Sequence, residues 1–191
     1  MGSILLFAVA VFAETPKVPP DRAVVVVVRG EGECLSGVAW NDLKTFVSSL
    51  FDEIGIRLIW QRGNSPPERA AITVYFARTA PGWTKQNGPA CSFPGALACS
   101  RPFDVASPTV IVMFDRARFY SRRPRLFNRL LAYTISHEMA HVIGARTTHS
   151  ETGIMKEHWT ADDFDRMEYS KLAFTSRDIE SIHEGFAIRH W

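Results

Sequence analysis

The chain has 191 residues, of which 46% are hydrophobic and 22% are charged, and its formal net charge is +2 at pH 7. This length and balance fit one domain with a packed core, alone or after a targeting segment, and they exclude a disordered or fibrous chain. The net charge is too small to indicate a nucleic acid or a membrane surface as partner.

The N-terminal residues 1–13 have the pattern of a signal peptide. Their apolar run, Ile4–Ala13, is too short to span a bilayer but suits the core of such a signal. The run is short and no basic residue precedes it, so a start codon further upstream and a buried N-terminal strand are the alternatives. Residues 14–21 then form a Pro-rich linker and residues 22–191 the folded domain. We therefore expect a secreted or periplasmic protein.

Export would place the three cysteines of the chain in an oxidising compartment. Cys91 and Cys99 flank a short loop that contains Pro94 and Gly95, and a disulfide between them is feasible. Cys34 is then left over. We expect an inert, partly buried thiol there, with a latent metal ligand as the alternative.

Strands dominate the first part of the domain. The continuous β-branched run Arg22–Arg29 predicts a strand that is buried on both faces. Apolar residues at helical spacing between Leu43 and Ile54 predict a helix, which Gly55 ends. The remaining strands are predicted at Ile56–Trp60, Ile72–Phe76 and Thr109–Phe114, with a short edge strand near Leu97.

Helices dominate the second part. Pro124 suits the first turn of a helix that should end near Gly144. The arginine-rich stretch Arg116–Arg129 overlaps its start, and we interpret it as a solvated loop and helix start, with a site for an acidic ligand as the alternative. Two later helices are predicted by the capping boxes Thr160 with Asp163 and Thr175 with Asp178. This order of elements predicts an α+β domain in which one mixed sheet of four to five strands packs against helices.

The segment HEMAHVIGARTTHSETGIM, His137–Met155, carries the strongest chemical signal. Residues four apart share a helix face, so His137 and His141 can present imidazole nitrogens to one ion at roughly 2.0–2.1 Å. Glu138 then lies beside the ion, where a base can take a proton from metal-bound water. The alternative is a pair of solvent-facing histidines on a core helix.

Two imidazoles leave a catalytic zinc short of its usual three protein ligands. Gly144 would let the chain leave the helix sharply, and His149 is the nearest strong ligand after it. The sequence therefore predicts zinc bound by His137, His141 and His149. We expect the other histidines to be surface residues, and of these only His158 is near enough to the motif to test; they are His158, His183 and His190.

The HExxH motif, followed by a glycine and a third histidine, resembles the metzincin clan of zinc endopeptidases. Met155 follows His149 by six residues, which is similar to the spacing in matrixins, where a methionine turn forms a floor under the metal. Ordinary core is the alternative for Met155. PGALACS around Leu97 resembles the matrixin edge strand, and FTSRDIESI resembles the last matrixin helix. HSETGIM followed by Trp159 is also similar to a group of small secreted bacterial proteins.

The chain departs from the strict metzincin pattern in the loop before the third histidine. Four residues separate Gly144 from His149 where the pattern HExxHxxGxxH has two, and Thr147 stands at the position of the usual ligand. Threonine is a poor zinc ligand, so we keep His149 and expect a longer loop. ECLSG around Cys34 does not match the matrixin latency motif.

The resemblance implies a zincin-like domain over residues 22–191 and a secreted zinc endopeptidase. Glu138 would take a proton from zinc-bound water and pass it to the leaving amine. A peptide or protein substrate would lie extended along the edge strand near Leu97. His158 and Tyr169 are candidates for stabilising the oxyanion because they follow the metal loop.

Two other classes of function stay open at this point. One is a zinc hydrolase that cleaves a non-peptide amide bond, and the other is a non-catalytic binding domain stabilised by zinc. Glu138 argues against the second class, because a structural site needs no base and normally closes with a fourth protein ligand. We expect neither a nucleic-acid partner nor a stable association with membranes.

Overall fold

The computed structural model describes most of the domain predicted from residue 22 onward. The predicted signal peptide and linker, as well as Cys91, lie outside the described residues, so secretion and the Cys91–Cys99 disulfide stay predictions. No helix in the described part of the chain is long and apolar enough to cross a bilayer. The described residues are 22–30, 32, 34–63, 71–78, 95–106, 108–121, 123–189 and 191.

One five-stranded mixed sheet forms the centre of the domain, with strand order β2-β1-β3-β5-β4. The pairs β1–β2, β1–β3 and β3–β5 are parallel, whereas β4 pairs antiparallel with β5 and forms an edge. The predicted mixed sheet and its short edge strand near Leu97 are thus present. The strands are β1 (Ala23–Arg29), β2 (Arg57–Arg62), β3 (Ala71–Ala77), β4 (Ala98–Ser100) and β5 (Thr109–Met113).

Strand β1 explains why the sheet needs cover on both sides. Successive side chains point to opposite faces of a sheet. Val26 and Val28 on one face and Val27 on the other are all at most 2% exposed. Burial on both faces is typical of a parallel strand inside a sheet, and it confirms the interpretation of the valine run. With three parallel pairs and one antiparallel pair, the structure confirms a single domain in which a mixed sheet of five strands packs against helices.

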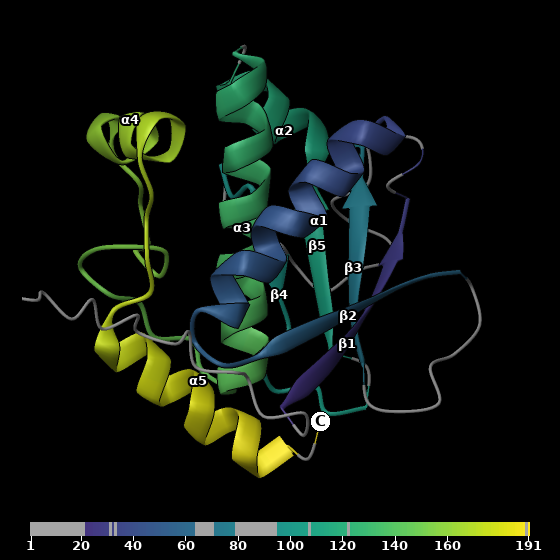
Figure 1. Cartoon of the computed structure of the whole chain (residues 1–191), viewed down its shortest axis with the longest axis vertical. Helices are drawn as coiled ribbons and strands as arrows, with labels where there is room; N and C mark the ends of the chain where they lie inside the picture. The colour runs from purple at the N-terminus through teal and green to yellow at the C-terminus, as the bar shows by residue number, and fades with distance from the viewer. Residues whose placement is uncertain are drawn as a thin grey trace, which may run out of the picture.

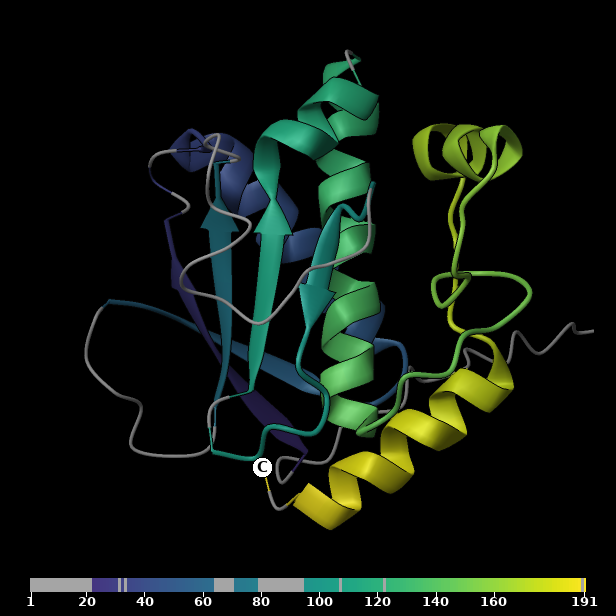
Figure 2. The same cartoon turned by 180° about the vertical axis from the view of Figure 1, so that it is seen from behind.

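Five helices complete the described part of the chain, and α1 and α3 lie together on one face of the sheet (Figures 1 and 2). Helix α3 is almost wholly buried from Leu130 onward, because the sheet and α1 cover it on one side while α4 and α5 contact it on others. The helices are α1 (Gly37–Asp52), α2 (Phe114–Tyr120), α3 (Pro124–Gly144), α4 (Ala161–Tyr169) and α5 (Ser176–Arg189).

The predicted helix ends are largely confirmed. Helix α3 begins at Pro124 and ends at Gly144. Both capping boxes form: the backbone N–H of Thr160 donates to Asp163 at 2.8 Å, and that of Thr175 donates to Asp178 at 2.8 Å. These bonds satisfy backbone donors at the starts of α4 and α5.

Helix α2 was not predicted. The expected strand Thr109–Phe114 ends at Met113, and Phe114 begins a helix of seven residues that includes part of the arginine-rich stretch. Only Phe114 and Ala117 of this helix are buried. Two buried positions are too few to mark a helical period in the sequence, so contacts with the rest of the fold determine the conformation of this segment.

The C-terminal end of α3 approaches α5 so closely that α5 needs a glycine at the contact. A Cβ atom at Gly185 would lie 2.3 Å from the carbonyl carbon of Gly144. Real Cβ contacts are essentially never this short, so a larger side chain would force the two helices apart. Figure 1 shows α5 crossing the end of α3 from which the chain continues toward His149.

Gly185→Ala should therefore destabilise the protein by about 1–3 kcal/mol, the usual cost of overpacking a core contact. Gly37→Ala is the matched control, because Gly37 begins α1 and a Cβ atom added there would have no neighbour within 4 Å. Urea unfolding of both variants measures the effect. Equal midpoints for Gly185→Ala and Gly37→Ala would contradict the close contact.

Candidate metal centre

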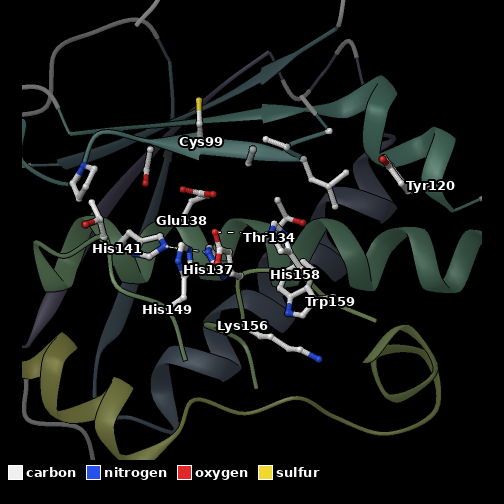
Figure 3. Close-up of a pocket in the computed structure, with 18 of the residues that line it drawn as sticks. Cys99, Tyr120, Thr134, His137, Glu138, His141, His149, Lys156, His158 and Trp159 are labelled. Carbon is white, nitrogen blue, oxygen red and sulfur yellow. Dashed lines mark hydrogen bonds and ion pairs between the residues drawn. The ribbon is translucent and has the colours of Figure 1, made fainter. Parts of the chain in front are cut away.

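Helix α3 presents its HExxH residues to a cavity between itself, β4 and the chain that follows His149. His137 and His141 are 9% and 6% exposed, and Glu138 is half-buried between them. Figure 3 shows the rings of these two histidines and of His149 converging, with Glu138 on the side that faces β4. The other parts of the wall include Leu97, Tyr120, Thr134, Lys156, His158 and Trp159.

Backbone carbonyl groups orient the two helical histidines. Nδ1 of His137 lies 2.8 Å from the carbonyl oxygen of Ile154, and Nδ1 of His141 lies 2.9 Å from that of Arg146. A carbonyl oxygen only accepts, so in each ring Nδ1 carries the proton and donates it. Nε2 is therefore left with a lone pair toward the cavity, as in histidines that ligate metals.

The three Nε2 atoms lie within 4.8 Å of one another, and two of the three separations are close to those that one ion requires. Nε2 of His141 is 3.0 Å from Nε2 of His137 and 3.2 Å from Nε2 of His149. Two nitrogens at roughly 2.0–2.1 Å from a tetrahedral zinc ion lie about 3.3 Å apart. Since Nε2 of His137 and Nε2 of His141 both direct a lone pair into the cavity, no hydrogen bond can form between them. A cation bound by both nitrogens would relieve the repulsion between the lone pairs. This donor set fits zinc.

The electrostatic surroundings keep these rings neutral. Burial lowers the pKa of His137. Burial, with smaller contributions from His137 and His149, lowers the pKa of His141 to about 3. The pKa of His149 is also lowered, by burial and by His137. Metal ligation requires neutral imidazoles, so all three are ready to bind at neutral pH.

Glu138 has the environment of a proton acceptor that is not itself a ligand. Burial raises the pKa of its carboxyl group, while a hydrogen bond with the side chain of Ser100 and the electrostatic interaction with His149 act in the opposite direction. Ser100 is the last residue of β4. The carboxylate is thus held between the metal ligands and the edge strand, and its raised pKa suits general base chemistry near neutrality.

The chain reaches His149 through an irregular loop, and one expectation about this loop was wrong. The reversal after α3 occurs at Ala145, which has the left-handed angles φ 49 and ψ 44, and not at Gly144. Gly144 lies instead at the contact with α5, next to Ser181 and Ile182. The loop is then closed by the backbone N–H of Ser150, which donates to the carbonyl of Met155 at 2.8 Å.

Of the other residues singled out in the sequence, some lie at the metal centre and others lie away from it. Trp159 lies beside the centre, with its ring 5.8 Å from that of His137, and Met155 is 5% exposed in the adjoining core. His158 lines the cavity. Tyr169 does not: it is 70% exposed and its hydroxyl contacts Arg123. His183 binds the carbonyl of Ile54, away from the site, and His190 lies outside the described residues.

Sequence reasoning missed three contributors to the centre. Arg146 and Ile154 act through backbone carbonyls, which any residue type can supply. Ser100 contacts Glu138 only because β4 lies beside α3. No local pattern distinguishes these positions in the sequence.

Comparison with known proteins supports the fold. No protein-family model matches the chain, and neither does any curated protein. Among solved structures, the chain is similar to archaemetzincin from Methanopyrus kandleri, with a TM-score of 0.52 and 14% sequence identity over 90% of this chain and 99% of that one. The chain therefore has an archaemetzincin-like fold, and its three-histidine group suggests zinc binding.

The lowered histidine pKa values predict how the stability of the zinc-free protein depends on pH. His141 has a pKa of about 3 when folded and near 6.5 when unfolded. Below pH 6.5 the unfolded chain therefore binds more protons at this residue than the folded protein does. The free energy of unfolding is retained above pH 6.5 and decreases as the pH falls below that value.

The measurement is urea unfolding of wild type and His141→Gln, both stripped of zinc, between about pH 7.5 and pH 5.5. The stability of wild type relative to the variant should decrease as the pH falls. Because both proteins contain Glu138, whose raised pKa gives the opposite trend, its contribution largely cancels in the difference. A difference that stays constant over this range would show that His141 is not held neutral by burial.

Proposed function

We propose that the chain is a zinc-dependent endopeptidase of metzincin type. The observation that carries the proposal is the convergence of three inward-facing Nε2 atoms with Glu138 beside them. A purely structural zinc site would normally close with a fourth protein ligand. In the described part of the chain the group consists of three residues only, and it opens on a cavity.

The roles of the side chains follow from their positions. Nε2 of His137, His141 and His149 would hold the ion, and the Nδ1 bonds to backbone carbonyls would keep the rings oriented. Zinc, when bound, supplies a Lewis acid that polarises a carbonyl group and acidifies water. Glu138 would accept the proton of the attacking water at a carboxylate oxygen and then donate it to the leaving amine nitrogen.

Strand β4 is the proposed place for the substrate backbone. It lies at the edge of the sheet next to Glu138 (Figure 3). Leu97 and Ser100 line the cavity. An edge strand offers N–H and C=O groups to which an extended peptide can add as a further strand. This arrangement would bring a scissile bond alongside the three histidines.

His158 is the better candidate for stabilising the oxyanion. It lines the cavity with a side chain that is 89% exposed, so the ring is free to turn toward a bound substrate. Tyr169 lies at Arg123 instead. Secretion and the Cys91–Cys99 disulfide belong to the same proposal and rest on the sequence.

Hydrolysis of denatured casein and of a peptide library, with and without a chelator, tests the proposal. Chelator-sensitive cleavage of peptides is the expected result. Zinc binding without peptide cleavage would contradict it and would favour a hydrolase of non-peptide amides or a binding domain.

Glu138→Gln should retain zinc and lose about 10²- to 10⁴-fold in kcat, because the substitution removes the base and leaves the ligands in place. Glu157→Gln is the matched control, since Glu157 lines the same cavity with an exposed side chain. Peptide hydrolysis and zinc content are measured on both. If Glu138→Gln turned over like Glu157→Gln, Glu138 would not be the base.

A further inference from the structure

The loop between the second and third histidines is longer than the strict metzincin spacing, and Arg146 lies in this longer part. Its backbone carbonyl accepts the Nδ1 proton of His141. Its own backbone N–H donates to the carbonyl of His141 at 3.1 Å. Arg146 is thus bonded twice to one metal-ligating residue, His141, and lies three residues before another, His149.

The side chain of Arg146 is held by the last helix. Nη1 donates to Oγ of Ser181 at 2.7 Å, and Nη2 pairs with Oε2 of Glu184. Oγ of Ser181 in turn donates to the carbonyl of Arg177 at 2.8 Å, which fixes the acceptor. The guanidinium group therefore has two partners on α5, in helical positions three residues apart.

This fixation matters because the preceding backbone is not regular. Ala145 is the only non-glycine residue with positive φ in the described part of the chain, and left-handed angles are costly for residues with a side chain. The carbonyl group of Arg146 must nevertheless point at His141. An anchor on the next side chain can supply that constraint from outside the loop.

We propose that Arg146 is a positioning residue for the metal centre: through its contacts with Ser181 and Glu184, helix α5 sets the orientation of His141 and the course of the loop to His149. The inference rests on the proposed zinc function. In this inference, metal affinity depends on Arg146, which is not itself a ligand, and on the C-terminal helix α5.

A general role in stability is separable from this positioning role. The side chains of Arg146 and Glu184 are 40% and 64% exposed. Ion pairs with this exposure contribute little to the free energy of folding. Substitutions at these positions should therefore leave the fold intact, whereas partners that orient a metal-ligating histidine typically change metal affinity 10- to 100-fold.

The test is the zinc dissociation constant, measured by chelator competition on the full domain for four variants and wild type. Arg146→Ala should weaken zinc binding roughly 10- to 100-fold, and Glu184→Gln should weaken it less. Arg146→Lys should recover part of the loss, because an ammonium group can still reach one partner. Arg177→Ala is the matched control, since Arg177 is an exposed arginine on α5; it should bind zinc like wild type.

A second readout does not depend on zinc. In metal-free protein the Nδ1 proton of His141 should exchange slowly with solvent in wild type and in Arg177→Ala, and faster in Arg146→Ala. Unchanged zinc affinity and unchanged exchange in Arg146→Ala would overturn the inference. Failure of wild type to bind zinc, with the exchange difference present, would overturn the proposed function and leave the positioning contact established.

Discussion

Two hydrogen bonds determine what the centre can do: those from Nδ1 of His137 and His141 to the carbonyl groups of Ile154 and Arg146. Each bond takes the ring proton to the side away from the cavity and leaves the Nε2 lone pair facing inward. With the opposite tautomer, the inward nitrogens would carry protons and no cation could bind. The metal chemistry therefore depends on backbone atoms of an irregular segment as much as on the HExxH helix.

Because the acceptors belong to this segment, other elements must hold it in place. Oγ of Ser150 donates to Asp178 at 2.5 Å, and the backbone N–H of Ile154 donates to the carbonyl of Ala173 at 3.0 Å. Helix α5 and the extended chain before it thus fix both ends of the segment Ser150–Ile154, which follows His149. The same helix contacts the end of α3 through Gly185. Helix α5 consequently both covers the core and holds the segment that carries the carbonyl groups in place.

The parts that could be predicted from the sequence are those with local causes. The bounds of α3 follow from Pro124 and the apolar period, and the choice of His149 over Thr147 follows from ligand chemistry. Helix α2 and the role of Gly144 could not be predicted, because both depend on contacts between segments distant in the chain. Arg146 meets Ser181 across 35 residues, and no pattern in the sequence marks that pair. The spacing of HExxH also says nothing about Ser100, which reaches Glu138 through the sheet.

The central claim is that three imidazoles, and no other protein group, hold one zinc ion in each chain. X-ray absorption at the zinc edge of purified protein tests it most directly, because the technique identifies ligand type and distance. Three imidazole nitrogens at roughly 2.0–2.1 Å are expected, and the signal of one imidazole should disappear in His149→Ala. A sulfur ligand at about 2.3 Å, or an unchanged spectrum in His149→Ala, would contradict the account.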